Sequence, residues 1–179
     1  MKEEKKILGE QRRQFILQWL KESGRPLTGA ELAAKTNVSR QVIVQDISLL
    51  KARNEPIIAT SQGYLYLKTP TANKTYTRVV ACFHTPEQTK EELYLIVDHG
   101  VTVKDVKIEH PVYGDLTASV MVSNRREVDQ FIQKIKETNS SYLLQLTDGT
   151  HLHTLEADSP AKLDAACATL KTAGFLIES

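Results

Sequence analysis

Two histidines separated by a single residue, His151 and His153, form the pair in this sequence that is best suited to holding a metal ion. They fall in a segment that predicts a β-strand, and residues two apart on a strand point to the same face. His84 ends another predicted strand, and Glu92 lies in the helix expected after it. If the two strands are neighbours, three imidazoles and one carboxylate meet at a single centre. Such a set of ligands is acceptable to zinc, nickel or ferrous iron.

The carboxylate of this candidate centre is ambiguous, because Glu91 lies beside Glu92. The histidine spacing also fits a pair that is exposed or hydrogen-bonded for structural reasons, so this interpretation stays open. Cys82 and Cys167 lie far apart and have no CxxC partner, which argues against a disulfide framework or a thiolate zinc site. We expect each cysteine to be a small apolar side chain in a core.

The other two histidines, His99 and His110, have different settings. His99 precedes the helix-ending Gly100, where a cation favours a helix C-terminus, and we expect no site role for it. His110 stands in a loop before a proline, which favours an extended backbone. We expect His110 and Tyr113 to lie at the rim of a ligand pocket, one hydrogen-bonding and the other stacking on an aromatic ring. The alternative is a structural turn with Tyr113 packed in the core.

The charge distribution divides the chain into a basic and an acidic part. Residues 1–68 contain 12 Lys and Arg against 7 Asp and Glu, whereas residues 69–179 contain 11 against 15. The basic part favours a polyanionic partner such as DNA. No apolar stretch approaches the roughly 18 residues needed to span a bilayer, and residues 1–11 lack the apolar core of a signal peptide. We therefore expect a cytoplasmic protein without a membrane partner.

Three helical patterns followed by two short strands predict a winged helix-turn-helix over residues 1–68. The first helix covers residues 10–23. Thr28 and Glu31 form a capping box that opens a short second helix. The third helix runs from Arg40 to about Arg53, and residues 56–67 predict the two strands of the wing. The alternative is a helical packing module whose polar face is only solvated.

The outward face of the third helix has side chains that suit the major groove of DNA. Arginine pairs with guanine, glutamine pairs with adenine, and a small apolar side chain can touch a thymine methyl group. The expected base contacts are Arg40, Gln41, Val44 and Gln45, and the expected phosphate contacts are Ser39, Lys51 and Arg53.

After a polar linker at residues 68–74, strands and helices alternate and predict an α+β domain over residues 75–179. The first strand, at 76–83, is followed by a helix that starts at Thr85-Pro86. Strands at 101–109 and 115–122 precede a helix at 125–137. A hairpin of strands 142–146 and 150–155 then turns at Asp148-Gly149, and a last helix covers 159–173. An additional short strand is expected at residues 175–177. The resulting order is β-α-β-β-α-β-β-α, with helices against one antiparallel or mixed sheet.

Several motifs resemble known families. Residues 27–33, 38–42 and 46–50 look like the winged helix-turn-helix of the biotin repressor and its relatives. His84-Thr85, the segment Val106-Lys-Ile-Glu-His-Pro-Val-Tyr-Gly114 and Thr150-His-Leu-His153 resemble the three-histidine (3H) domain. Joined in one chain, the two resemble the niacin-responsive bacterial repressors of NAD biosynthesis and salvage. The resemblance covers nearly the whole chain and implies a metal held by His84, Glu92, His151 and His153.

The resemblance also implies a function. We expect a repressor of genes for NAD biosynthesis and niacin uptake, which binds operator DNA as a homodimer with nicotinic acid as corepressor. A metal with an open coordination position would take the carboxylate or the ring nitrogen of this ligand. The alternatives are a repressor that responds to the metal itself or to another metabolite, and a metal-dependent hydrolase. The hydrolase is disfavoured because the sequence offers no separate nucleophile or general base, so we expect no enzyme activity.

Overall fold

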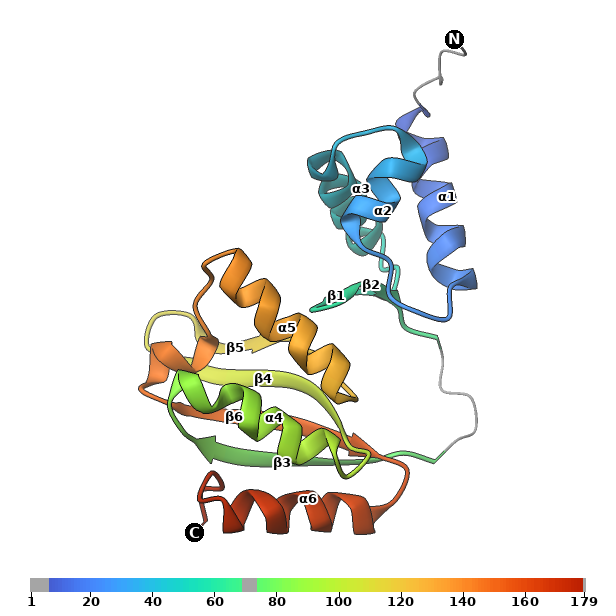
Figure 1. Cartoon of the computed structure of the whole chain (residues 1–179). Coiled ribbons are helices and arrows are strands. Elements are labelled where there is room, and N and C mark those ends of the chain that lie inside the picture. Colours follow the sequence, from blue (N-terminus) through green and yellow to red (C-terminus); the bar gives the residue numbers. More distant parts are fainter. Residues whose placement is uncertain (1–6, 69–73, 179) are drawn as a thin grey trace. The chain divides into compact units, whose positions relative to one another are not determined.

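The computed structural model describes residues 7–68 and 74–178, and the chain divides into two compact units at residue 71 (Figure 1). Residues 69–73 of the expected linker lie outside the described residues. In the described parts of the chain, no helix has the length and apolar character needed to cross a membrane.

The first unit contains three helices followed by a two-stranded antiparallel sheet. The helices are α1 (Gly9–Glu22), α2 (Gly29–Thr36) and α3 (Arg40–Ala52), and the strands are β1 (Ile57–Thr60) and β2 (Gly63–Tyr66). This order confirms the expected winged helix-turn-helix. The apolar faces of the helices share one core with the start of the wing, which contains Ile16, Leu20, Leu32, Ile43, Ile47, Leu50 and Ile57.

Side-chain caps mark the starts of α2 and α3. The Thr28 hydroxyl accepts a hydrogen bond from the backbone N–H of Glu31, whose carboxylate accepts one from the backbone N–H of Thr28. This is the predicted capping box. Asn37 ends α2 in the left-handed conformation with φ of 51°, and the Ser39 hydroxyl then accepts from the backbone N–H of Val42 to begin α3. The helix-turn-helix geometry is therefore encoded locally.

A buried ion pair fixes the orientation of α3 against α1. Arg12 Nε donates to Asp46 Oδ2 at 2.5 Å, and Arg13 Nη1 donates to Asp46 Oδ1 at 3.1 Å. Asp46 is 2% exposed, so this residue of α3 points toward α1. The opposite face of α3 is left to contact a partner.

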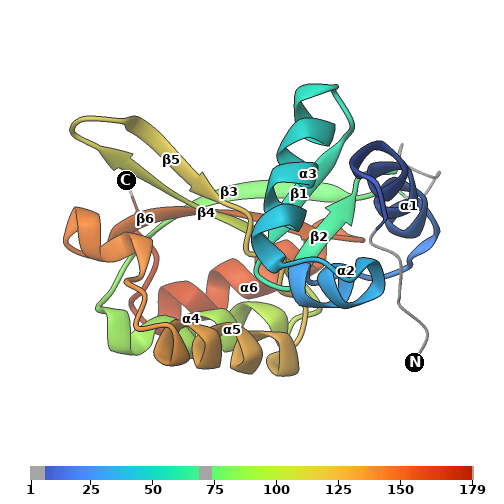
Figure 2. The same cartoon turned by 90° about the horizontal axis from the view of Figure 1, so that it is seen from above.

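The second unit is an antiparallel sheet with three helices on one face (Figure 2). The strands are β3 (Tyr76–Phe83), β4 (Thr102–His110), β5 (Gly114–Ala118) and β6 (Thr150–Ala157), in the spatial order β3-β6-β4-β5. The helices are α4 (Thr89–Val97), α5 (Arg125–Glu137) and α6 (Pro160–Thr172), with 3-10 turns η1 (Pro86–Gln88) and η2 (Leu143–Thr147). The expected α+β class is confirmed.

The two faces of this sheet differ sharply in burial. On the inner face, Val80 and Leu155 pack with the three helices in one apolar core. On the outer face, Val79 is 56% exposed, Phe83 is 54% exposed and Leu152 is 39% exposed. The alternation follows the two-residue period of a strand. The three helices of this unit all lie on the inner face, and none of its described helices covers the outer face (Figure 2).

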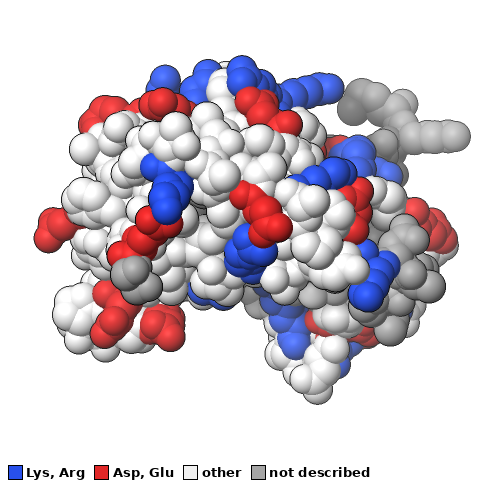
Figure 3. All heavy atoms as spheres, turned by 90° about the horizontal axis from the view of Figure 1, so that it is seen from below, with Lys and Arg blue, Asp and Glu red and all other residues white. Residues whose placement is uncertain are grey.

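Charged side chains of both signs accompany the apolar residues of the outer face. Lys104 Nζ donates to Glu156 Oε2 at 3.1 Å, and Lys107 Nζ donates to the Thr154 hydroxyl at 3.0 Å. Basic and acidic residues are also interspersed on the face of the molecule that Figure 3 shows. This agrees with the formal net charge of +1 for the chain.

The predicted strand at residues 142–146 was wrong, because this segment forms the 3-10 turn η2. A hairpin partner would have to pair with an edge of β6, but β3 and β4 already occupy both edges. The Asp148-Gly149 turn does form, with φ of 51° and 103°. It joins η2 to β6, so the observed order is β-α-β-β-α-β-α. Residues 175–177 contribute only an isolated bridge, between Leu176 and Cys82.

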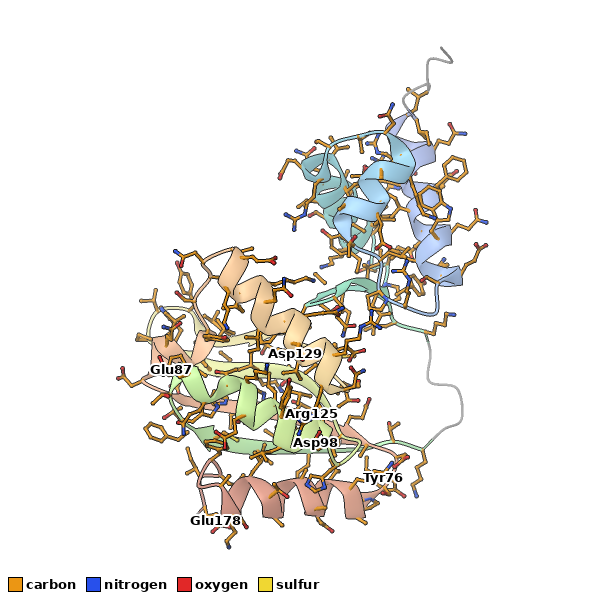
Figure 4. The ribbon with its side chains drawn as sticks, viewed as in Figure 1. Tyr76, Glu87, Asp98, Arg125, Asp129 and Glu178 are labelled. Atoms are coloured by element: carbon orange, nitrogen blue, oxygen red, sulfur yellow. The ribbon has the colours of Figure 1, made fainter. Side chains whose placement is uncertain are left out.

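Ion pairs and hydrogen bonds on the surface connect α4 to α5. Arg125 donates two hydrogen bonds to Asp98, at 2.7 and 2.5 Å. Asp129 accepts hydrogen bonds from the Tyr94 hydroxyl at 2.6 Å and pairs with Lys90 Nζ at 2.7 Å. Figure 4 shows Asp98, Arg125 and Asp129 gathered where the two helices meet. These contacts hold α4 in a fixed position over the sheet.

Candidate functional site

Strand pairing between β3 and β6 brings the candidate metal ligands together. The two strands are antiparallel, with Cys82 opposite His151 and Val80 opposite His153. His84 follows the end of β3, and its backbone N–H donates to the Gly149 carbonyl at 3.4 Å. The condition set by the sequence, that the two strands be neighbours, is therefore met.

A glycine at position 149 permits this close approach. A Cβ atom there would lie 2.5 Å from the carbonyl oxygen of His84, and the residue has φ of +103°. Both features exclude a larger side chain without displacement of the backbone. Gly149 therefore sets how near His151 comes to His84.

The carboxylate of Glu92 lies at the centre of the three histidines. Its Oε2 atom is 2.7 Å from His84 Nε2 and 3.2 Å from His153 Nε2, and its Oε1 atom is 3.2 Å from His151 Nε2. Glu92 is fully buried, whereas Glu91 is exposed. The structure thus brings together the four residues expected, and it places Glu92 rather than Glu91 among the imidazoles.

Backbone carbonyls fix which ring nitrogen of each histidine faces the centre. The Nδ1 atoms of His84, His151 and His153 lie 2.7, 2.9 and 2.7 Å from the carbonyl oxygens of Thr85, Gly149 and Asp105. A carbonyl oxygen can only accept, so each Nδ1 carries a proton. In a neutral imidazole the inward Nε2 atom then presents a lone pair. Histidines that bind metals usually have their other ring nitrogen held by a hydrogen bond in this way.

Three lone pairs facing a carboxylate suit a positive charge at the centre. Protons on all three Nε2 atoms would bury three imidazolium groups against one carboxylate, which is unfavourable without solvent. A divalent cation would supply the charge, and the four donors are of the types that such an ion accepts. Two ligands on one tetrahedral zinc ion lie roughly 3.3 Å apart, given a zinc–nitrogen distance of about 2.0–2.1 Å. The separations of 2.7 to 3.2 Å between Glu92 and the imidazoles are hydrogen-bond distances and are shorter than that spacing. Among the described residues, the group whose ligand atoms all lie within 4.8 Å of one another is Cys82, Glu92 and His151.

The protonation of the cluster follows from the same contacts. Burial alone would raise the pKa of Glu92, but the charge on His153 and hydrogen bonds from the three histidines hold this pKa well below its ordinary value. Burial alone would lower the pKa of His84 and of His153, but their hydrogen bonds and charge interaction with Glu92 raise it. The carboxylate is therefore ionised.

Cys82 joins this cluster, which the sequence analysis did not anticipate. Its Sγ atom lies within 4.8 Å of ligand atoms of both Glu92 and His151, and the residue is fully buried. Burial and the nearby carboxylate raise the pKa of the thiol, so it remains protonated. The available signal was its position two residues before His84, which puts both side chains on one face of β3.

A cavity of about 170 Å³ opens beside the cluster. Glu92, His151 and His153 form one part of its wall. Most of the remaining wall is apolar and comes from α4, α5, η2 and the strands β4 and β5. These residues include Leu93, Val106, Ala118, Val120, Phe131, Ile135 and Leu144.

His110 and Tyr113, the expected residues of the pocket rim, do not line this cavity. They lie in the β4–β5 hairpin, where His110 Nδ1 accepts hydrogen bonds from the backbone N–H groups of Val112 and Tyr113. Tyr113 is 75% exposed, so packing in the core was also wrong. His110 is the last residue of β4 rather than a loop residue, and its hydrogen bonds close the turn of the hairpin. His99 donates to or accepts from the Thr169 hydroxyl at 2.8 Å.

The residues expected to contact DNA occupy the outward side of α3. The side chains of Arg40, Gln41, Gln45 and Lys51 are exposed, and Val44 is half-buried. Two of the expected phosphate contacts have partners within the protein. The Ser39 hydroxyl caps α3, and Arg53 donates two hydrogen bonds to Glu10, at 2.8 and 3.1 Å.

Two family models match the chain, one in each unit. The model for the 3H domain matches residues 77–179, and the model for an HTH domain matches residues 12–65. The resemblance drawn from the sequence motifs is therefore confirmed for both parts of the chain.

Two curated relatives are similar to the chain over nearly their whole length. "Transcription repressor NadR" from Bacillus subtilis (strain 168) is 63% identical over 179 residues, which cover 99% of each chain. "Probable transcription repressor NiaR" from Thermotoga maritima is 39% identical over 173 residues, which cover 97% of each chain. Both relatives are named as transcription repressors, which confirms the expected regulator over a hydrolase.

Proposed function

The chain belongs to the 3H-domain family of transcription repressors with an N-terminal HTH domain, and from this premise we propose that it represses genes of NAD biosynthesis and niacin uptake with nicotinic acid as corepressor. One observation carries the proposal. A buried set of three histidines and a glutamate borders an apolar cavity in the unit that does not bind DNA. A sensor for a small aromatic acid needs these two features side by side.

The size of the cavity selects ligands with one ring. An apolar cavity of about 150 Å³ in another protein holds a benzene molecule, and this cavity measures about 170 Å³. Nicotinic acid is one six-membered ring with a carboxylate. A dinucleotide such as NAD is several times larger and does not fit. The effector is therefore the small precursor rather than the finished cofactor.

A metal at the cluster explains how an acidic unit binds an anion. We assign His84, Glu92, His151 and His153 as its protein ligands, and the metal would supply a Lewis-acidic positive charge. The residues of the chain have separate tasks. The three backbone carbonyls orient the imidazoles, and the apolar wall excludes water, so that a charge interaction within the cavity is stronger than in solvent.

A dimer is the form in which this repressor would read DNA, because helix-turn-helix repressors bind two half-sites one helical turn apart. We propose that the second copy packs on the outer face of the sheet, where Val79, Phe83 and Leu152 are exposed. The charges on this face have both signs, with Lys104 beside Glu156. A surface that carries both signs can be complementary to itself across a two-fold axis.

Analytical ultracentrifugation tests this interface. Phe83→Lys places a charge in the apolar patch and should turn the dimer into a monomer. Val112→Lys, at a more exposed apolar position in the β4–β5 hairpin, should leave the dimer intact. If the Phe83→Lys protein still sediments as a dimer, the interface lies on another surface.

Isothermal titration calorimetry of the zinc-loaded full chain tests the effector. Nicotinate should bind with one site per chain, and NAD should not compete. Glu92→Gln should lose nicotinate binding together with its metal, while Glu91→Gln should keep both. If nicotinate fails to bind the metal-loaded protein, the effector assignment is wrong. If nicotinate binds equally well to metal-loaded and metal-free protein, the metal takes no part in effector binding.

A further inference from the structure

One hydroxyl group in the wall of the cavity has no hydrogen-bond partner. Thr89 is the first residue of α4, is 6% exposed and lines the cavity. Its Oγ1 atom is buried, and no described residue lies in hydrogen-bonding position to it. Leaving a buried hydroxyl unpaired costs free energy, so a ligand or a trapped water has a reason to bind there.

Other hydroxyl groups on the helices of this protein are satisfied within their own helix. Thr36 donates to the carbonyl of Leu32 at 2.7 Å, and Thr169 donates to the carbonyl of Ala165 at 3.0 Å. Thr89 lies in the first turn of α4 and makes no such bond. Its hydroxyl is thus free to donate to a molecule in the cavity.

Thr89 and Glu92 are three residues apart on α4, and both line the cavity. Residues at this spacing are neighbours on a helix face, with Cβ atoms about 5–6 Å apart. This distance is comparable to the span of one substituted six-membered ring. A ring whose two polar groups lie at different positions can therefore reach both the metal cluster and the hydroxyl.

We propose that Thr89 is a specificity-determining residue, whose hydroxyl donates a hydrogen bond to the ring nitrogen of the effector. This inference rests on the proposed function. The carboxylate of the effector lies toward the cluster of Glu92 and the histidines, where the metal supplies positive charge. The apolar wall leaves the ring nitrogen without water, so the Thr89 hydroxyl decides whether a pyridine or a benzene ring is preferred.

Two ligands and one isosteric variant test the proposal. Nicotinate and benzoate differ by the ring nitrogen, and Thr89→Val removes the hydroxyl at nearly constant volume. Calorimetry on the zinc-loaded full chain should show that wild type binds nicotinate about tenfold more tightly than benzoate, the effect of one hydrogen bond. Thr89→Val should bind nicotinate about tenfold more weakly, bind benzoate as wild type does, and so lose the preference.

Thr89→Ser keeps a hydroxyl and should keep the preference for nicotinate. The melting temperature of ligand-free Thr89→Val should equal or exceed that of wild type, because the variant removes an unpaired polar group, and this separates a binding defect from misfolding. Thr89→Val that retains the wild-type preference for nicotinate would overturn the role of Thr89. Wild type that binds neither ligand would instead overturn the proposed function.

Discussion

Glu92 Oε2 lies 2.7 Å from His84 Nε2, within a cluster where every histidine directs Nδ1 at a backbone carbonyl. The contact links α4 to the end of β3. Since each Nδ1 carries a proton, the inward nitrogens are available as ligands.

Removing the central carboxylate should remove the metal. Glu92→Gln replaces an ionised ligand by a neutral amide, so we expect metal affinity to fall by more than about 100-fold, beyond the roughly 10–100-fold usual when a residue that only orients a ligand is changed. Metal content after dialysis, measured by inductively coupled plasma mass spectrometry, gives the answer. Glu91→Gln is the matched control because Glu91 is the exposed neighbour of Glu92. Full metal content in Glu92→Gln would contradict the assignment.

Cys82 should orient Glu92 rather than bind the metal. Its thiol is buried beside the carboxylate, and three imidazoles with one carboxylate already make the four donors of a tetrahedral site. Cobalt-substituted protein should therefore lack the intense near-ultraviolet absorption of a thiolate–cobalt bond, and Cys82→Ser should retain the metal. A strong charge-transfer band that disappears in Cys82→Ser would show that the thiolate is a ligand.

Gln45 should contribute to reading the operator sequence. It is exposed on α3, and a glutamine paired with adenine contributes about 1–3 kcal/mol of discrimination. Gln45→Ala should weaken binding to the operator while leaving binding to random DNA nearly unchanged, as measured by fluorescence anisotropy at fixed salt. Gln14→Ala, an exposed glutamine on α1, is the control. An equal loss on both DNAs would make Gln45 a backbone contact.

Glu10 should limit the affinity for DNA by holding Arg53. The Glu10 carboxylate accepts hydrogen bonds from Arg53 and from Arg13, and these contacts lower its pKa to about 2. Glu10→Gln frees positive charge, so non-specific binding should tighten and its salt dependence should become steeper, by about 0.9 for each added phosphate contact.

Two variants decide whether this effect runs through Arg53. Glu22→Gln removes the same charge at the other end of α1 and should change the salt dependence less. In Arg53→Ala, the further change Glu10→Gln should have little effect. If Glu10→Gln tightens binding equally with and without Arg53, the pairing does not control the DNA surface.

The sequence predicted those features that depend on local patterns. The capping box of Thr28 and Glu31, the helix at 125–137 and the shared face of His151 and His153 follow from spacings of a few residues. His84, Glu92, His151 and His153 come together only if β3 pairs with β6. The family resemblance implied that these four residues form one site, whereas their spacing in the sequence did not establish the strand pairing.

The features that the sequence missed depend on long-range packing. Residues 142–146 could not form a strand because β3 and β4 occupy both edges of β6. The exposure of Tyr113 follows from how far the β4–β5 hairpin extends, which its motif does not encode. The unpaired hydroxyl of Thr89 was also not predicted. Thr36 and Thr169 donate to carbonyls of their own helices, so the presence of a threonine in a helix does not show that its hydroxyl is unpaired.

The most direct test of the account is the affinity of the zinc-loaded chain for a promoter fragment of a niacin or NAD salvage gene, with and without nicotinic acid at fixed salt. A ligand shifts such an equilibrium only through its differential affinity for the DNA-binding state. We predict that wild type binds the fragment more tightly when nicotinic acid is present. Glu92→Gln should still bind the fragment, but with an affinity that nicotinic acid does not change. Wild-type binding that follows added metal and ignores nicotinic acid would contradict the account and identify a metal sensor.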